Sequence, residues 1–279
     1  MILLTEKEIK QIINSELLDL DEIEISIDLG KSLSKFKIGK GIINFETEKI
    51  LVQKFKDLKI KKNNIYFVEN SEVQKFYFFS ETRKRSYKLL PTKKWPTLTL
   101  DSTPMHRFTL IDPKKDTELK IKVIRPVKGI VLDTCFGLGY TAIMASKKAK
   151  EVYTFEEDCN VIEIAKVNPF SDLAFSSENI ILKNQDVFEG IKEFKDGFFD
   201  RIIHDPPTLK YAGLLYSNEF YSQLYRVLKK NGIGYMYIPR PGVSKNRRGL
   251  EISISKRLKK IGFKCEFLEE SQAIKIKKV

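Results

Sequence analysis

The chain has 279 residues, 42% of them hydrophobic, which is enough for one large domain or two small ones with a substantial core. It contains no run of about 18 apolar residues and no apolar stretch with a cleavage site at its start, so we expect neither a transmembrane helix nor a signal peptide. Three scattered cysteines are too few for a disulfide framework or a zinc site. We therefore expect a cytoplasmic protein without a bound metal.

The charge is strongly positive, with 50 Lys and Arg against 37 Asp and Glu, a net charge of +13. Residues 31–95 alone hold 17 Lys and Arg against 6 Asp and Glu. Such an excess favours a polyanionic partner. A solvated lysine-rich surface, of the kind that heat-adapted proteins carry, is the alternative.

Residues 1–95 predict a small basic domain of α+β or β-rich type. Apolar residues at helical spacing predict a helix over 4–19, and Thr5 followed by Glu8 has the spacing of a capping box. From Asp21 the apolar period changes to two, which predicts a strand ending before Gly30. Further strands are expected at 33–38, 42–45, 65–68 and 75–79.

Four adjacent aromatic residues, 76–79, precede a basic segment at 83–88. Aromatic and basic residues interleave in this way on surfaces that stack RNA bases. Adjacent aromatics on a strand also commonly divide between a core face and a supporting face. RNA binding by this domain is therefore a hypothesis, and residues 1–95 carry no known RNA-binding signature.

Residues 96–128 predict a proline-punctuated connector just upstream of a glycine-rich loop. His106 and Arg107 are polar groups that a lid over the site would bring to the substrate. His106 equally fits a surface histidine with its hydrogen bonds satisfied.

The stretch 131–142, VLDTCFGLGYTA, predicts a buried parallel strand, a glycine loop and a helix. Gly137 and Gly139 permit a sharp turn and the close approach of a ligand, because a Cβ would intrude there. The helix start would aim free N–H groups at that ligand. Ala142 completes a dinucleotide-type glycine spacing, but that match alone is weak, and an ordinary strand-to-helix turn is the alternative.

Asp133 ends this strand, and the pattern D-x-x-x-G-x-G resembles the first motif of class I S-adenosylmethionine-dependent methyltransferases. The resemblance implies that the loop backbone holds the methionine part of the cofactor. The implied cofactor-binding residues here are Asp133, Cys135, Gly137, Gly139, Tyr140 and Thr141. Cys135 fits a small packed residue better than a nucleophile.

From residue 129 onward, strands and helices alternate as in a doubly wound sheet. Strands are expected at 129–132, 151–155, 179–182, 199–204, 234–238, 263–268 and 273–278, and helices at 140–148, 160–167, 187–194, 218–230 and 250–261. Seven strands ending in a hairpin with one antiparallel strand resemble the class I methyltransferase sheet. The predicted fold is therefore α/β, a Rossmann-like class I methyltransferase domain over 129–279, preceded by the smaller domain.

Acidic residues follow the first four strands of this sheet, at the edge where such sheets bind ligands. Glu156 lies about 20 residues beyond the first glycine, where an acid accepts hydrogen bonds from ribose hydroxyls. In the methyltransferases, an acid in the place of Asp186 binds the adenine amino group. Asp186 also fits a helix N-cap, and both roles are compatible.

Asp205-Pro206-Pro207 follows the fourth strand and resembles the motif of methyltransferases that act on exocyclic amines of bases. Such a nitrogen is a poor nucleophile because it is conjugated with the ring. A carboxylate and a backbone carbonyl fixed by rigid prolines can hold it with its lone pair aimed at the methyl group. Asp205 would then stabilise the positive charge that develops on nitrogen. A rigid turn out of the strand is the alternative.

Thr208 departs from that motif, because the usual aromatic residue stacks on the base and threonine cannot. Tyr211, Tyr216, Phe220 or Phe136 would have to supply that face. The segment 240–249 follows the fifth parallel strand, and its Arg240, Lys245, Arg247 and Arg248 suit phosphate contacts. A solvated loop is the alternative for this segment.

From about residue 98 to the C-terminus, these motifs together resemble an archaeal family of predicted class I methyltransferases. The match includes Asn168-Pro169 and Leu215-Tyr216-Ser217 besides the glycine loop and the Asp-Pro-Pro motif. The resemblance implies S-adenosylmethionine as cofactor but does not identify the substrate. From the Asp-Pro-Pro motif and the basic charge we expect an exocyclic amine, cytidine N4 or guanosine N2, in structured RNA, with ribosomal RNA favoured and transfer RNA close behind. Two alternatives stay open, an aminopropyltransferase-like small-molecule enzyme of the same fold and a non-catalytic RNA-binding protein.

Overall fold

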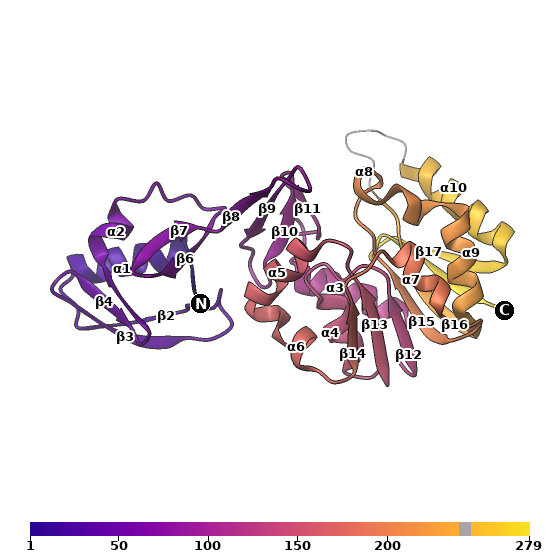
Figure 1. Ribbon diagram of the computed structural model, residues 1–279, viewed down its shortest axis with the longest axis horizontal. Coiled ribbons are helices and arrows are strands. Elements are labelled where there is room, and N and C mark those ends of the chain that lie inside the picture. The colour runs from indigo at the N-terminus through magenta and orange to yellow at the C-terminus, as the bar shows by residue number, and fades with distance from the viewer. Residues whose placement is uncertain (240–246) are drawn as a thin grey trace. The chain divides into compact units, whose positions relative to one another are not determined.

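The computed structural model describes residues 1–239 and 247–279, and they form two compact units (Figure 1). Unit 1 comprises Met1–Pro113 with Lys166–Phe170, and unit 2 comprises Lys114–Ala165 with Ser171–Val279. The expected connector 96–128 contains regular structure: β10 (Thr97–Leu100), β11 (Thr103–Pro104) and α3 (Pro113–Val123). None of the helices in these described ranges is long and apolar enough to cross a membrane.

Unit 1 is rich in β-structure, as its sequence predicts. One sheet has the order β1-β6-β7, with strands Ile2–Thr5, Ile65–Glu69 and Glu72–Lys75. A second has the order β2-β3-β4-β5, with strands Glu22–Ile25, Ser34–Gly39, Ile42–Phe45 and Glu48–Leu51. The third, β11-β10-β9-β8, includes β9 (Arg85–Leu90) and β8 (Tyr77–Ser80). The helices are α1 (Glu6–Leu17) and α2 (Val52–Lys56).

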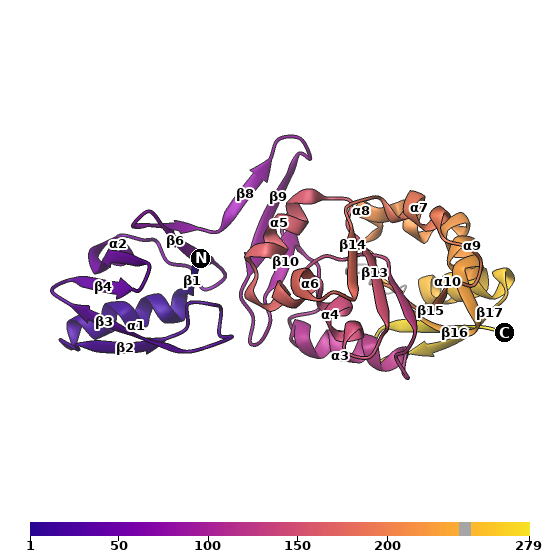
Figure 2. The ribbon, with the colours of Figure 1, turned by 60° about the horizontal axis from the view of Figure 1, so that its bottom comes forward.

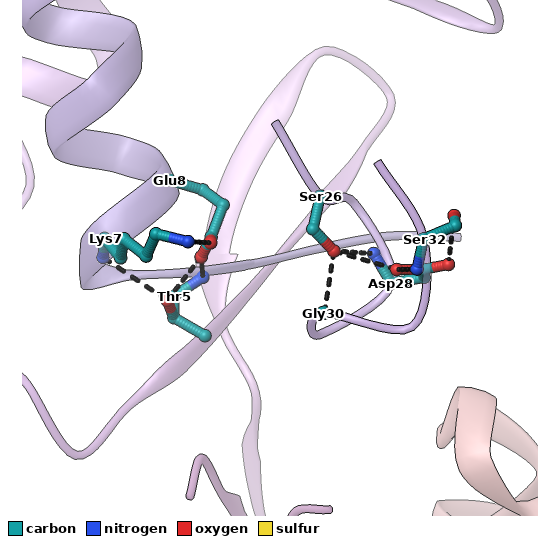
Figure 3. Close-up of polar contacts among 7 residues, drawn as sticks. All are labelled: Thr5, Lys7, Glu8, Ser26, Asp28, Gly30 and Ser32. Carbon is teal, nitrogen blue, oxygen red and sulfur yellow. Dashed lines mark hydrogen bonds and ion pairs between the residues drawn. The ribbon is translucent and has the colours of Figure 1, made fainter. Parts of the chain in front are cut away.

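The first helix begins where its capping box predicts. The carboxylate of Glu8 accepts a hydrogen bond from the backbone N–H of Thr5 at 3.1 Å, while the Thr5 hydroxyl accepts from the N–H of Lys7 at 3.3 Å (Figure 3). These contacts satisfy backbone donors that the first turn leaves unpaired. Ile9 and Ile12 then face the core of unit 1 with no exposed area. Figure 3 also shows the carboxylate of Asp28, which accepts hydrogen bonds from the Ser26 hydroxyl and from the backbone N–H of Ser32.

Unit 2 contains one seven-stranded sheet with the order β14-β13-β12-β15-β16-β18-β17. The strands are β12 (Ile130–Asp133), β13 (Glu151–Phe155), β14 (Ile180–Lys183), β15 (Phe199–His204), β16 (Leu228–Tyr237), β17 (Phe263–Leu268) and β18 (Ala273–Lys278). β12 to β16 pair in parallel, whereas β18 is antiparallel to both of its neighbours. This confirms the predicted sheet and its closing hairpin.

Helices cover both faces of this sheet (Figure 2). An apolar core lies on one face, where α7 (Val187–Gly190), α9 (Asn218–Val227) and α10 (Arg247–Ile261) pack on the strands. On the other face, α4 (Tyr140–Ser146) packs against β12, β13 and β14. The remaining short helices are α5 (Cys159–Val167), η1 (Pro169–Ser171), α6 (Asp172–Ser176), η2 (Ile191–Glu193), α8 (Leu209–Ala212) and η3 (Gly213–Tyr216).

Several predicted helices have different bounds in the structure, and two of them show why. The helix expected over 218–230 ends at Val227, because Leu228 is fully buried and pairs with Phe199 as the first residue of β16. The turn at Asn231 and Gly232, expected to end the helix, lies within the β16 segment, and Asn231 has a φ of 63°. The helix expected over 187–194 divides into α7 and η2.

Candidate functional site

The ends of the parallel strands bring together most of the predicted site residues of unit 2. Asp133 is the last residue of β12, Glu156 follows β13, and Asp205 follows β15. β12 lies between β13 and β15, so the connections from β12 and β15 leave the sheet in opposite directions. Sheets of this kind bind ligands in the crevice at that switch point. The candidate site is this edge.

Asp133 is completely buried, and one of its oxygens is held by two threonines. Its Oδ2 accepts hydrogen bonds from the hydroxyls of Thr154, at 2.9 Å, and Thr141, at 3.0 Å. Its Oδ1 has no hydrogen-bond partner among the described residues. Burial raises the pKa of this carboxyl to about 7, against the two threonine bonds, which lower it. A buried oxygen without a partner at a strand end is an acceptor available to a ligand donor.

The two glycines of the loop differ in what surrounds them. Both have positive φ, 56° at Gly137 and 75° at Gly139. A Cβ on Gly139 would lie 2.7 Å from the Phe136 ring and 2.9 Å from Ala174 Cβ, so this glycine is required for packing. A Cβ on Gly137 would meet nothing within 4 Å. Gly137 therefore borders open space, where a ligand can approach the backbone.

Glu156 is half-buried and folds back onto the glycine loop. It accepts hydrogen bonds from the backbone N–H of Gly137, at 3.0 Å, and of Asp158, at 3.1 Å. Burial raises the pKa of its carboxyl to about 7, although both backbone bonds lower it. The carboxylate thus lies beside the open space at Gly137.

The other predicted cofactor residues have structural contacts that the sequence alone left open. Asp186 caps α7, accepting a hydrogen bond from the N–H of Phe188 at 2.8 Å. The Thr141 hydroxyl donates a hydrogen bond to Asp133, as described above, and Tyr140 is buried in the same turn of α4. The thiol of Cys135 is half-buried, and burial raises its pKa well above the usual value, which disfavours a nucleophilic thiolate.

Asp205 forms an ion pair with a residue that the sequence analysis did not single out. Lys120, on α3, is 4% exposed, and its Nζ lies 2.5 Å from Asp205 Oδ2 and 2.9 Å from Asp116 Oδ2. Burial alone would lower the pKa of this lysine. The two carboxylates outweigh burial and raise the pKa above its usual value. A buried ammonium therefore faces the carboxylate proposed to hold the acceptor.

His204 joins the ends of β12 and β15 beneath the site. Its Nε2 lies 3.0 Å from the carbonyl oxygen of Leu215, so Nε2 carries the proton, and Nδ1 then accepts from the Thr134 hydroxyl at 3.0 Å. The ring is fully buried, and burial lowers its pKa to about 3. This neutral histidine fixes the backbone next to Asp205.

The prolines after Asp205 are held by Tyr216. The Tyr216 hydroxyl donates to the carbonyl oxygens of Pro207, at 2.9 Å, and Pro206, at 3.3 Å. Tyr216 is 5% exposed, so its ring offers no face on which a base could stack. Phe220 and Phe136 are also buried. Tyr211, half-buried on α8 and close to Lys210, is the aromatic candidate of these four that retains an accessible ring.

The remaining substrate candidates belong to unit 1, to the segment that the structure does not describe, or to the start of α10. His106 and Arg107 belong to unit 1, where His106 Nδ1 is 3.0 Å from the Thr97 hydroxyl, the satisfied arrangement that the sequence analysis left open. Arg240 and Lys245 fall outside the described residues. Arg247 and Arg248 open α10.

Comparison with known proteins identifies the fold. No protein-family model matches the chain. The spermidine synthase of Thermotoga maritima is 18% identical, with a TM-score of 0.55 over 73% of this chain and 71% of that one. A spermidine synthase in complex with the transition-state analogue AdoDATO is 19% identical, with a TM-score of 0.57 over 73% and 72%. MnmC2 from Aquifex aeolicus is 18% identical, with a TM-score of 0.50 over 69% and 70%. The fold is thus that of spermidine synthases and class I methyltransferases.

Two sequence relatives differ in how much of the chain they match. The polyamine aminopropyltransferase of Prochlorococcus marinus is 34% identical over 110 residues, which cover 38% of this chain and 37% of that protein. The protein named "Uncharacterized protein MJ1233", from the archaeon Methanocaldococcus jannaschii, is 39% identical over 265 residues, covering 93% of this chain and 89% of the relative. This similarity extends over both units, and the chain therefore belongs to the MJ1233 family.

Proposed function

We propose that the protein is an S-adenosylmethionine-dependent methyltransferase that acts on an exocyclic amine of a base in structured RNA. Cytidine N4 and guanosine N2 are the proposed acceptors, and ribosomal RNA is favoured over transfer RNA. The observation that carries the proposal is the position of Asp205-Pro206-Pro207, directly after β15 and next to the edge formed by Asp133, the glycine loop and Glu156.

The residues at this edge fit S-adenosylmethionine. The buried Asp133 Oδ1 lacks a hydrogen-bond partner among the described residues and can accept from the methionine ammonium or from a water bound to it. Glu156 can exchange its bond from the Gly137 N–H for bonds from ribose hydroxyls. Gly137 borders the space that a ligand needs. The cofactor supplies an electrophilic methyl group, and these side chains would hold and orient it.

Asp205 and the proline carbonyls fit the requirements of an amine acceptor. An exocyclic amine offers two N–H donors but a delocalised lone pair, so its reaction depends on orientation. The carboxylate of Asp205 can accept one N–H, and a proline carbonyl can accept the other, since a carbonyl oxygen has two lone pairs and Tyr216 uses one. As positive charge develops on the nitrogen, the anionic Asp205 stabilises it.

A surface of unit 1 supports RNA as the partner. Tyr77 and Phe79 alternate on β8 and are 49% and 47% exposed, whereas Phe78 stacks on Tyr87 at 4.9 Å. The register places Tyr77 opposite Lys88, and the Nζ of Lys75 lies 4.6 Å from the centre of the Tyr77 ring. Two exposed rings flanked by cations suit the stacking of unpaired bases and the contact of phosphates.

The second candidate is an aminopropyltransferase, which the 110-residue similarity to a polyamine aminopropyltransferase favours. Such an enzyme must bind a cationic polyamine, which needs carboxylates available at the acceptor position. Asp205 instead already pairs with the ammonium of Lys120. The methyltransferase is therefore the better-supported function.

The test is methyl transfer from labelled S-adenosylmethionine to total RNA from cells that lack this protein, followed by nucleoside analysis. We expect label in N4-methylated cytidine or N2-methylated guanosine with the wild-type protein and none with Asp205→Ala. Aminopropylation of a diamine by the decarboxylated cofactor, with no label in RNA, would establish the second candidate instead. A protein that binds RNA but neither S-adenosylmethionine nor its decarboxylated form would be a non-catalytic RNA-binding protein.

A further inference from the structure

A buried ammonium stands between two carboxylates at the proposed acceptor position. Asp116 and Lys120 lie one turn apart on α3, and Asp116 is 1% exposed. Lys120 reaches from this pair to Asp205, whose side chain is 18% exposed and so still borders solvent. Of these three groups, Asp205 is therefore the one that a substrate can reach from solvent, and Lys120 connects it to the buried Asp116.

The charge of Lys120 is permanent under ordinary conditions. An isolated buried ammonium would shed its proton, but here two carboxylates at 2.5 Å and 2.9 Å keep it charged. The contact uses Oδ2 of Asp205, and a carboxylate has four lone-pair sites over its two oxygens. Asp205 can therefore accept an N–H from a substrate while it still holds Lys120.

We propose that Lys120 determines the charge of the acceptor, so that the site takes a neutral conjugated amine and rejects an alkylammonium. The inference rests on the proposed amine chemistry at Asp205. A second ammonium at Asp205 would come within a few ångströms of the Lys120 ammonium in a partly buried setting, where like charges repel strongly. An aromatic amine is uncharged on binding and avoids that repulsion. Lys120 is thus a positioning residue, and its charge distinguishes this site from one that binds a polyamine.

The same network accommodates the charge that appears during the reaction. Two carboxylates and one ammonium are fixed side by side here, and Asp205 places its negative charge beside the acceptor nitrogen. That charge suits a nitrogen that becomes positive only as the bond to the methyl group forms. Proton loss from the methylated nitrogen then restores the neutral amine, and the Asp205 carboxylate that holds this nitrogen can receive the proton.

The test compares the binding of 1,4-diaminobutane by the wild type, Lys120→Met and Lys120→Arg in titration calorimetry with full-length protein. Removal of the ammonium exposes Asp116 and Asp205 to the diamine, so Lys120→Met should bind it at least about tenfold more tightly than the wild type. Lys120→Arg keeps the charge and should exclude the diamine as the wild type does. Equal diamine affinity of wild type and Lys120→Met, or tight binding by the wild type, would overturn the proposal.

A charge-balanced variant keeps the test valid if Lys120→Met fails to fold. The double variant Asp116→Asn, Lys120→Met removes one buried charge of each sign and leaves Asp205 facing the site. It should also gain diamine binding, and a folded double variant without that gain would overturn the proposal. The RNA methylation assay is read separately. Absence of RNA methylation with a gain of diamine binding refutes the proposed function alone, whereas RNA methylation without the gain refutes the role of Lys120 alone.

Discussion

Asp205 differs from the other strand-end acids in its contacts, which gives it a separable phenotype. It pairs with Lys120, whereas Asp133 and Glu156 contact the loop and helix at the predicted cofactor position. Replacing Asp205 with Asn should therefore lower methyl transfer by about a hundredfold or more, through loss of a preorganised charge, and leave the affinity for S-adenosylmethionine within about threefold. Single-turnover kinetics and calorimetry measure the two quantities.

Asp196→Asn is the matched control for this substitution. The Asp196 side chain is 80% exposed and pairs with Arg226 at the surface, so its loss should change neither quantity. Turnover that survives Asp205→Asn would show that this carboxylate does not hold the acceptor. A parallel loss of cofactor affinity would show that its role lies in binding the cofactor.

Asp133 predicts an unusual pH dependence for the stability of the cofactor-free protein. Its pKa is about 7 in the folded state, against an ordinary value of 3.8, so between these values the folded protein holds a proton that the unfolded chain has lost. The free energy of unfolding should therefore fall as pH rises from about 4 to about 7, by up to about 4 kcal/mol from this residue, and then level off.

Asp133→Asn isolates this effect from that of His204. The pKa of His204 is about 3 when folded, against an ordinary value of 6.5, so His204 raises the free energy of unfolding as pH rises through that window. Asn at position 133 can keep an acceptor for Thr154 and Thr141 but does not titrate. Between pH 5 and pH 7.5, the free energy of unfolding measured in urea should change more negatively in the wild type than in the variant. Equal changes in the two proteins would mean that Asp133 is ionised in the folded protein throughout.

At the level of elements, the glycine loop offers a matched pair of substitutions. Gly139→Ala places a Cβ within 2.7 Å of Phe136 at a φ of 75°, so it should destabilise the fold by about 2–4 kcal/mol. Gly137→Ala has open space for its Cβ and faces only the backbone cost of positive φ, about 1–2 kcal/mol. Thermal unfolding should rank the two variants in this order.

Gly137→Ala should also lower the affinity for the cofactor. The Cβ at position 137 enters the space proposed for the cofactor, so the folded Gly137→Ala protein should bind S-adenosylmethionine at least about tenfold more weakly. Calorimetry on the folded protein measures this loss. Wild-type affinity in Gly137→Ala would place the cofactor away from this glycine.

The sheet of unit 2 could be predicted because its strands carry their own signal. Apolar residues that alternate with charged ones marked 263–268 and 273–278 with the bounds that β17 and β18 have. The end of α9 could not be predicted in the same way. Leu228 fits the helical pattern and the sheet equally well, and its pairing with Phe199, distant in sequence, decides between them.

The residues missed by sequence reasoning are those whose role depends on tertiary contacts. Lys120 follows Asp116 at helical spacing, which usually indicates a surface ion pair, and Asp205 lies 85 residues away. The prolines of 96–128 indicated a connector, so α3 was not expected. Tyr216 was expected as a stacking residue from its type alone, whereas its burial and its bonds to the proline carbonyls follow from the path of η3.

At the scale of the whole molecule, the positive charge and the exposed aromatics can be tested together through RNA binding. The hairpin of β8 and β9 lies in a region where Lys and Arg greatly exceed Asp and Glu, and Tyr77 and Phe79 point to the same face. Base stacking on such rings contributes about 1–3 kcal/mol per base. Tyr77→Ala with Phe79→Ala in the full chain should therefore weaken binding to single-stranded RNA by about tenfold or more.

Salt dependence and steady-state kinetics give this double variant a distinctive signature. Stacking does not release counterions, so the slope of log affinity against log salt should stay at the wild-type value, whereas removal of Lys75 and Lys88 should reduce it. Leu110→Ala, at a position 86% exposed in unit 1, is the control for loss of exposed apolar area. In the methylation assay, the aromatic variant should raise KM for RNA and leave kcat unchanged, because unit 2 alone contains Asp205 and the glycine loop. A fall in kcat at unchanged KM would instead mean that unit 1 takes part in orienting the acceptor base.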